Sequence, residues 1–257
     1  MADREINLLG LTYLNQPMDT VAAGIIAAAK EKSDFRYVVT PNVAHVVELD
    51  RDPETLKPLF ASAWLRLCDS RVLAAVSNIL FGQPVEVVPG SDLTVELLER
   101  ASHERMDVCV VGLSNADMAE LRKRYPGIAF FHHNAPMGLR TSADARAECR
   151  AHIEAAHCEL TLLATGMPQQ EMIAYETFLA GNAKGIGACI GASLDFIIGK
   201  QTRAPRWMQR LGCEWLFRLM TDPKRLARRY LIDCPGIFAI ALRFRSARAL
   251  QGPTQRA

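Results

Sequence analysis

Short apolar runs alternate along most of the chain with segments whose apolar positions recur at helical spacing. Most of the runs are continuously apolar, which is typical of strands covered on both faces. The predicted strands are Glu5–Leu14, Arg36–Thr40, Arg66–Asp69, Asp107–Leu113, Ile128–His133, Glu159–Gly166 and Lys184–Ile190. The predicted helices are Met18–Lys32, Ala44–Ala63, Arg71–Phe81, Leu93–His103, Asn115–Tyr125, Ser142–His157 and Gln169–Ala180.

This alternation predicts an α/β fold, a Rossmann-like and mostly parallel sheet with helices on both faces. Residues 1–195 are expected to form this Rossmann-like core. Ligands of such sheets bind at the carboxyl ends of the strands. Polar residues that directly follow the predicted strands are therefore the candidates for a functional site.

The pattern changes after about residue 195, and residues 196–257 are predicted to form a helical C-terminal appendage. Within it, apolar residues recur every four positions and predict one helical face. These residues are Trp207, Leu211, Trp215 and Leu219.

The appendage is strongly basic. From Lys200 to the end the chain has 13 Lys and Arg but only 3 Asp and Glu, a formal charge of +10, whereas the whole chain carries +2. Such a segment favours an anionic partner, either phospholipid head groups, a diphosphate or nucleic acid. Arg218, Arg225 and Arg228 are seven and three positions apart, so one helix face can present all three to a phosphate. The alternative is a solvated basic helix that packs on the core by its Trp and Leu stripe.

The seven cysteines include no CxxC pair, which favours a reducing compartment and argues against a disulfide framework or a zinc site. No stretch has the roughly 20 apolar residues that a membrane-spanning helix needs. We therefore expect a protein that can lie on a membrane but does not span it.

Two predicted strands end in residues that suit a substrate pocket. Thr40 and Asn42 flank Pro41 between a strand and a helix, where they can hold a ligand hydroxyl or phosphate or simply cap the helix. Asp69 ends the next strand and can serve as a general base or as a helix cap, and both roles can coexist.

Two turns into helices add further candidates. Gly90 permits close backbone approach at a helix start that favours anions, although a capped loop explains it equally well. Gly166 ends a strand, and Pro168 fits a first helical turn. Gln170 and Glu171 then stand at a helix start beside the expected cleft, where uridine and sugar hydroxyls need amide and carboxylate partners.

Three other motifs are weaker. Gly185–Gly191 resembles a dinucleotide-binding loop, but its spacing and its place late in the sheet favour a buried strand whose glycines admit a close neighbour. Asp50–Asp52 has the DxD form of many metal-binding glycosyltransferases, but a solvated helix face suits it better. His132 and His133 are adjacent on a strand, so at most one points into a site, and no metal site is expected.

Several segments together resemble one family. They are Thr40–Asn42, Gly166–Glu171, Gly191–Phe196, Arg203–Met208, Gly212–Leu219 and Pro223–Leu231. In these segments the chain resembles the WecG/TagA/CpsF glycosyltransferases, also called glycosyltransferase family 26. It departs from the family pattern at Ser70, where glycine is usual, at Val87, where arginine is frequent, and over His132–Leu139. These departures bear on the identity of the donor or acceptor sugar and not on the class of reaction.

The resemblance implies transfer of a sugar from a UDP-sugar to an undecaprenyl-diphosphate-linked acceptor sugar. The sugar would be of the N-acetylmannosamine type, its uronic acid or a hexose, and the product a precursor of cell-surface polysaccharide or teichoic acid. The resemblance further implies inversion at the anomeric centre, no metal ion, and action on the inner face of the cytoplasmic membrane. It also implies that the appendage contacts the anionic membrane surface and completes the active site.

Roles for particular residues follow from the same resemblance. Asp69 corresponds to the proposed general base, Thr40 and Asn42 to substrate-pocket residues, and Gln170 to a glutamine near the donor. The arginines at 218, 225 and 228 correspond to those proposed to neutralise the leaving diphosphate.

Two other function classes remain open from the residues alone. An NAD-type oxidoreductase would use the Gly185–Gly191 loop. A nucleic-acid-binding module would use the basic appendage, but the chain has no recognisable nucleic-acid motif and no nucleic-acid partner is expected. A homo-oligomer is compatible with the sequence, which does not fix the oligomeric state.

Overall fold

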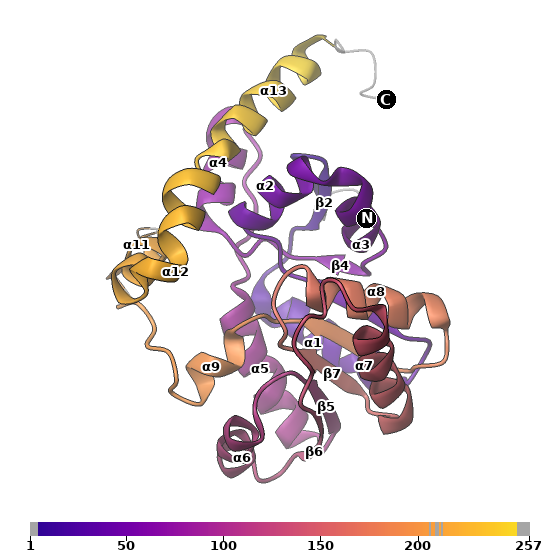
Figure 1. Ribbon diagram of the computed structural model, residues 1–257. Helices are drawn as coiled ribbons and strands as arrows, with labels where there is room; N and C mark the ends of the chain where they lie inside the picture. Colours follow the sequence, from indigo (N-terminus) through magenta and orange to yellow (C-terminus); the bar gives the residue numbers. More distant parts are fainter. Residues whose placement is uncertain (1–4, 206, 209–210, 212, 251–257) are drawn as a thin grey trace.

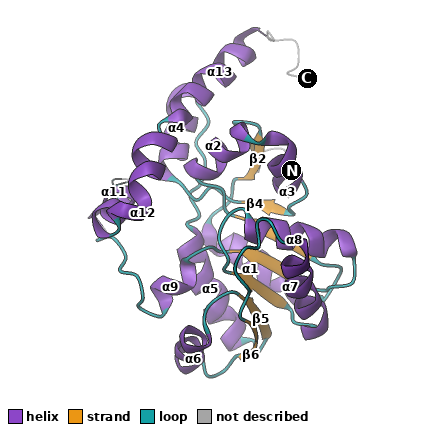
Figure 2. Ribbon diagram, in the orientation of Figure 1, coloured by secondary structure: helices purple, strands orange, loops and turns teal. Residues whose placement is uncertain are grey.

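The computed structural model describes residues 5–205, 207–208, 211 and 213–250. Its centre is a six-stranded, wholly parallel sheet with the order β4-β3-β8-β7-β5-β6 (Figures 1 and 2). The strands are β3 (Arg36–Val39), β4 (Leu65–Arg66), β5 (Asp107–Val111), β6 (Ala129–His133), β7 (Leu160–Leu163) and β8 (Ile186–Cys189). The predicted α/β fold with a parallel sheet is confirmed.

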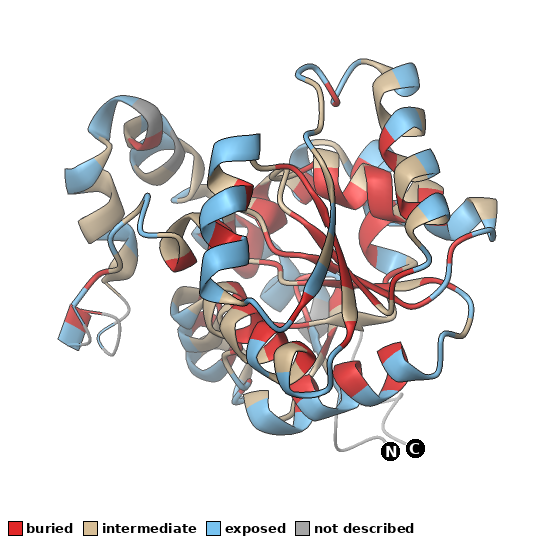
Figure 3. Ribbon diagram, turned by 90° about the horizontal axis from the view of Figure 1, so that it is seen from below, coloured by how far each residue is buried: buried red, intermediate tan, exposed pale blue. Residues whose placement is uncertain are grey.

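Helices cover both faces of the sheet, and its four central strands, β3, β8, β7 and β5, are buried between them (Figure 3). Val108 and Val110 of β5 pack on one side, whereas Cys109 and Val111 pack on the other. This two-sided burial explains why the strands are continuously apolar. The helices of the core are α1 (Met18–Lys30), α2 (Val43–Arg51), α3 (Pro53–Ala61), α4 (Arg71–Phe81), α5 (Gly90–His103), α6 (Asn115–Arg124), α7 (Ala143–Ala156) and α8 (Gln169–Ala180).

Two predicted elements are each divided in the structure. Residues 5–14 form a hairpin of β1 (Glu5–Leu8) and β2 (Leu11–Leu14), and not one strand. Leu9 and Gly10 turn the chain with φ values of 51° and 82°, as a two-residue hairpin turn requires. The predicted helix Ala44–Ala63 is broken at Asp52, whose side chain caps α3.

Strand β8 carries the glycines that resemble a dinucleotide-binding loop. A Cβ on Gly187 would lie 2.5 Å from Cζ of Phe35, and Gly185 abuts the backbone at Glu159. The interpretation of a buried strand with close neighbours is therefore confirmed. A short helix, α9 (Ser193–Ile197), does follow this strand, although none was expected.

The C-terminal part consists of short helices and one long one. They are α11 (Glu214–Thr221), α12 (Pro223–Ala227), the π-helix η2 (Arg228–Asp233) and α13 (Gly236–Leu250). The expected single helical face is wrong in two respects. Trp207 and Leu211 lie before the N-cap of α11, and Arg218 lies on a different helix from residues 225 and 228. The break falls at Pro223, which lacks the backbone N–H that a continuous helix needs.

Helix α13 returns to the core, where it lies against α2 and α4 (Figure 1). Its residues Ile237, Ile240 and Ala241 are buried in the same cluster as Val47 of α2. Two ion pairs of 2.7 Å reinforce the contact, Arg243 with Asp50 and Asp233 with Arg51.

The Asp50–Asp52 segment thus binds the appendage and caps α3, a structural role in line with its interpretation as a helix face. Across the described ranges, we found no helix of sufficient length and apolar character to cross a membrane.

Candidate functional site

A cleft of about 1310 Å³ lies at the carboxyl ends of the strands, with the appendage forming part of its wall. Its lining includes Thr40 after β3, Asp69 beyond β4, Gly166 after β7 and Gly191 after β8. These are loops in which the sequence predicted a site, and the parallel sheet brings them together. From the appendage, the lining includes Glu214, Trp215, Arg218, Leu226, Tyr230, Leu231 and Phe238.

Asp69 is the carboxylate placed between the core and the appendage. Its Oδ1 accepts a hydrogen bond of 3.2 Å from the backbone N–H of Gly90. Burial raises the pKa of Asp69 to about 7, although the Gly90 N–H, the Arg218 charge and a side-chain hydrogen bond from Asn42 oppose that rise. An aspartate with such a pKa is suited to take up and release a proton near neutral pH.

Gly90 is the first residue of α5 and is buried between Thr40 and Asp69. A Cβ at this position would lie 3.0 Å from Thr40 Oγ1 and 3.8 Å from Asp69 Oδ2. The glycine therefore permits the close backbone approach that the sequence suggested, and its N–H contacts Asp69 and not open solvent. Thr40 lines the cleft, with its hydroxyl 3.5 Å from the Cys189 carbonyl.

Asn42 begins α2 and lines the cleft. Its Oδ1 accepts from the Ala44 N–H at 3.1 Å and lies 2.8 Å from Nδ1 of His45. The backbone N–H of Asn42 also donates to His45 Nδ1, at 3.2 Å. Both the cap and the imidazole therefore fix the amide of Asn42 at the mouth of β3.

Gln170 and Glu171 begin α8 but have different surroundings. Gln170 lines the cleft, and its Oε1 accepts from the Gly191 N–H at 2.8 Å while its Nε2 donates to Glu171 Oε1 at 2.7 Å. Glu171 is only 1% exposed and lies outside the cleft lining. Burial raises the pKa of Glu171 to about 7. Glu171 therefore lies behind Gln170, where it does not face the space that a substrate would occupy.

Arg218 is the appendage arginine that the structure places in the cleft. Its guanidinium stacks 4.9 Å above the ring of Phe196 and donates to Glu214 at 2.7 Å. Burial alone would lower the pKa of Arg218, but Glu214, Tyr230 and Asp69 outweigh it and raise the value. The guanidinium is therefore a permanent positive charge opposite Asp69.

The other two predicted arginines are not brought to the same place. Arg228 is exposed and does not line the cleft. The side chain of Arg225 falls outside the part of the protein that the structure describes.

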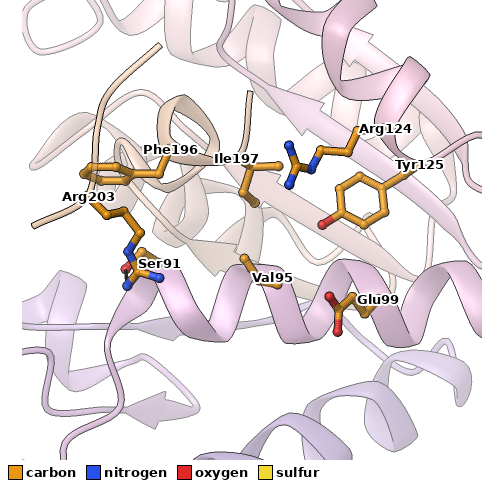
Figure 4. Close-up of a pocket in the computed structure, with 8 residues that line it drawn as sticks. All are labelled: Ser91, Val95, Glu99, Arg124, Tyr125, Phe196, Ile197 and Arg203. Carbon is orange, nitrogen blue, oxygen red and sulfur yellow. Dashed lines mark hydrogen bonds between the residues drawn. The ribbon is translucent and has the colours of Figure 1, made fainter. Parts of the chain in front are cut away.

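A smaller pocket of about 400 Å³ adjoins the cleft and shares Ser91 and Phe196 with it (Figure 4). At one end Arg203 donates to Ser91 Oγ at 2.9 Å and pairs with Asp92 at 2.5 Å. These contacts tie the segment after α9 to the start of α5, the same turn whose backbone holds Asp69. Arg203 therefore helps to fix the start of α5, whose Gly90 N–H binds Asp69.

The histidines at the end of β6 have structural contacts. His132 Nε2 lies 2.9 Å from the Gly112 carbonyl, and His133 stacks on His152 with ring centroids 5.2 Å apart. The described residues include no group of three or more His, Cys, Asp or Glu arranged to hold a metal ion.

Three residues of the site were missed in the sequence. His45 stands at the N3 position of α2, where a capping-box pattern starting at Asn42 would have found it. Glu214 stands four residues before Arg218, the spacing of a helical ion pair. Phe196 carried no local signal, because its contact with Arg218 depends on how the appendage folds back.

The fold and the cleft define an α/β enzyme of the Rossmann-like type, with a charged site at the carboxyl ends of a parallel sheet. The model of the Glycosyl transferase WecG/TagA/CpsF family matches residues 6–251. The chain belongs to this family and is a glycosyltransferase, as its resemblance indicated. The match gives no support to the oxidoreductase and nucleic-acid alternatives.

Curated relatives agree with the family. The chain is 24% identical over 231 residues to an N-acetylglucosaminyldiphosphoundecaprenol N-acetyl-beta-D-mannosaminyltransferase of Staphylococcus aureus strain MRSA252, with 87% of each chain covered. The enzymes of the same name from strains NCTC 8325 / PS 47 and COL give the same identity and coverage.

Proposed function

We propose that the protein transfers an N-acetylmannosamine-type sugar, its uronic acid or a hexose from a UDP-sugar to an acceptor sugar linked to undecaprenyl diphosphate. The product would be a precursor of a cell-surface polysaccharide or teichoic acid. The observation that carries the proposal is the placement of Asp69 and Arg218 in one cleft, with a carboxyl suited to proton transfer opposite a fixed cation. The names of the Staphylococcus aureus relatives support the lipid-linked acceptor.

In the proposed reaction, Asp69 takes the proton from an acceptor sugar hydroxyl. The hydroxyl oxygen attacks the anomeric carbon and forms the new glycosidic bond with inversion. The bond between that carbon and the UDP phosphate oxygen breaks, and its electron pair leaves with UDP. Arg218 stabilises the negative charge on the phosphate, an effect that typically contributes a factor of about 10²–10³ in rate.

The residues around these two groups suit the remaining tasks. Thr40, Asn42 and Gln170 line the cleft and are proposed to contact the sugar or uridine, and Gly166 and Gly191 leave space at the strand ends. The residues at 225 and 228 keep their proposed role toward the diphosphate only if substrate binding brings their guanidinium groups to the cleft.

The appendage is proposed to contact an anionic membrane surface. Its large apolar side chains include several that stay exposed, among them Leu231 and Ile232 of η2 and Phe238 and Leu242 of α13, which are 56–68% exposed. They adjoin the wall of the cleft, because Leu231 and Phe238 also line it. A lipid-linked substrate would reach the cleft from that side.

The deciding experiment measures UDP release from a panel of UDP-sugars, with and without a diphosphate-lipid-linked N-acetylglucosamine acceptor, in the presence of EDTA. Acceptor-dependent release in EDTA is the expected result, and it would identify the donor and establish metal independence. If folded protein releases no UDP in EDTA or with added Mg²⁺ or Mn²⁺ for any donor, the proposal is wrong. Release that needs the added cation would correct only the expectation of metal independence.

A further inference from the structure

Polar contacts connect the ends of four neighbouring strands along the lining of the cleft, and Glu171 alone of their members lies behind it. The contacts run from the Gly191 N–H to Gln170 and from Gln170 to Glu171. They continue from Glu171 to His45, from His45 to Asn42, and from Asn42 to Asp69. The remaining contact joins Glu171 Oε1 to His45 Nε2 at 3.9 Å, within the range of an ion pair. We call this set the strand-end network.

His45 Nδ1 makes two contacts that require opposite protonation states of that nitrogen. Its Nδ1 faces both the Asn42 backbone N–H, which needs an unprotonated nitrogen, and Asn42 Oδ1, which needs a protonated one. Its Nε2 faces Glu171, whose second oxygen is buried with no hydrogen-bond partner. A proton on Nδ1 donates to Asn42 Oδ1, and this fixes the amide so that its N–H groups are directed at Asp69.

We propose that His45 is a positioning residue for the base, oriented by Glu171 and acting through the Asn42 amide. The inference rests on the proposed function, in which Asp69 is the base. His45 does not touch the reacting atoms in this scheme. It keeps a hydrogen-bond donor on Asp69, and that donor stabilises the carboxylate form that accepts the proton.

Other titratable groups near the network have defined states. Tyr37 of β3 and Cys189 of β8 are near Glu171, and burial raises the pKa of both, which keeps them neutral. Glu48 lies one turn beyond His45 on α2 and pairs with Arg51. Asp69 is next to Cys68, whose thiol stays neutral because burial raises its pKa to about 12. Asp69 also interacts with the charges of Glu214 and Arg218 of α11.

The test compares H45Q and E171Q with the exposed control variants H103Q and E120Q in the full-length protein. Loss of the Asn42 donor should raise the pKa of Asp69, so the acid limb of the kcat profile should move to higher pH by roughly half a unit to one unit. We expect kcat to fall about 10-fold or more and the KM of the donor to stay within about twofold. E171Q keeps an oxygen that accepts the Gln170 N–H, so its thermal unfolding should stay cooperative.

The outcomes separate the inference from the function on which it rests. Suppose that D69N is inactive but that H45Q and E171Q fold and have the same kcat and the same acid limb as the control variants. That result would overturn the positioning role of His45 and leave the base assignment intact. Wild type without acceptor-dependent UDP release, or D69N with normal turnover, would remove the base assignment and the inference with it.

If H45Q does not fold, ¹⁵N NMR of the His45 ring in wild type and E171Q decides the question. We expect wild type to keep Nδ1 protonated to a higher pH than E171Q. Identical titration of the ring in both proteins would overturn the coupling.

Discussion

Asp69 is a half-buried carboxylate in the cleft with few contacts that stabilise its charge. One backbone N–H and the Asn42 amide stabilise its charge, and Arg218 adds a more distant attraction, yet the pKa of Asp69 remains raised to about 7. A helix-capping aspartate would have a lowered pKa, and here Ser70 caps α4 through its own hydroxyl. The residue is therefore free for chemistry, which the sequence could not decide because both roles fit its position.

Replacing Asp69 tests the base directly. D69N should lower kcat by about 10²–10⁴-fold, the usual contribution of a positioned base, with a smaller change in the KM of the donor. In wild type, kcat/KM should rise with pH through about 7, since the base acts only when it is deprotonated. Steady-state UDP release across pH measures both effects, and near-normal turnover of D69N would reject the assignment.

Asp69 should also make folding stability depend on pH, but in the opposite direction to activity: the protonated form stabilises the fold, whereas the deprotonated form is the active base. Because its folded pKa is raised, the stability that comes from protonated Asp69 is fully present below about pH 4 and is lost as the pH rises toward 7. Asparagine does not titrate, so the Tm of D69N relative to wild type should be higher at pH 8 than at pH 4. Thermal unfolding at both pH values checks this, and an unchanged difference would mean that Asp69 is not held in its neutral form.

At the scale of elements, the sequence predicts the bounds of a helix where residues at its two ends determine where it starts and stops. The bounds of α4 and α8 agree with prediction to the residue, because Ser70 and Gly82 delimit the first and Pro168 and Gly181 the second. The hairpin at residues 5–14 was missed since an apolar Leu9 occupies its turn. The pairing of β3 with β8, which brings the Thr40 hydroxyl to the Cys189 carbonyl, cannot be predicted from either strand alone.

Two glycines offer a matched pair of substitutions at this scale. G187A places a methyl group against the buried Phe35 ring and should destabilise the protein by about 1–3 kcal/mol. G24A adds a methyl group to an exposed position of α1 with nothing within 4 Å, and should stabilise it by roughly 0.5–1 kcal/mol. Chemical denaturation of both variants decides, and a G187A protein as stable as G24A would contradict the close packing of β8.

At the scale of the molecule, the appendage is both a wall of the cleft and the carrier of an exposed apolar surface. Its basic composition and aromatic residues predicted an anionic or membrane partner. The breaks between its helices and its return to α2 and α4 could not be predicted from the sequence, nor could the fact that Arg218 is the predicted arginine found in the described lining. Tertiary contacts, and not local periodicity, determine how this segment folds.

The exposed apolar surface gives a prediction for membrane binding. The F238S/L242S variant should bind vesicles containing anionic lipid several-fold less tightly while its Tm stays unchanged, because both side chains are exposed. Binding of wild type should also weaken as salt rises, since part of the attraction is electrostatic. L179S, at an exposed position of α8, is the control, and equal sedimentation of all three proteins would contradict a membrane role for η2 and α13.

The lining of the cleft begins at Thr40 and ends at Phe238, so it draws on almost the whole length of the chain. During synthesis the six strands of the sheet are made before the C-terminal helices. The wall that carries Arg218 follows β8, the last strand of the sheet in the chain, and is therefore made after the whole sheet. A nascent chain can therefore contain all strands of the sheet before it has a complete site, and catalysis should begin only once the segment that carries Arg218 has been made and has folded back.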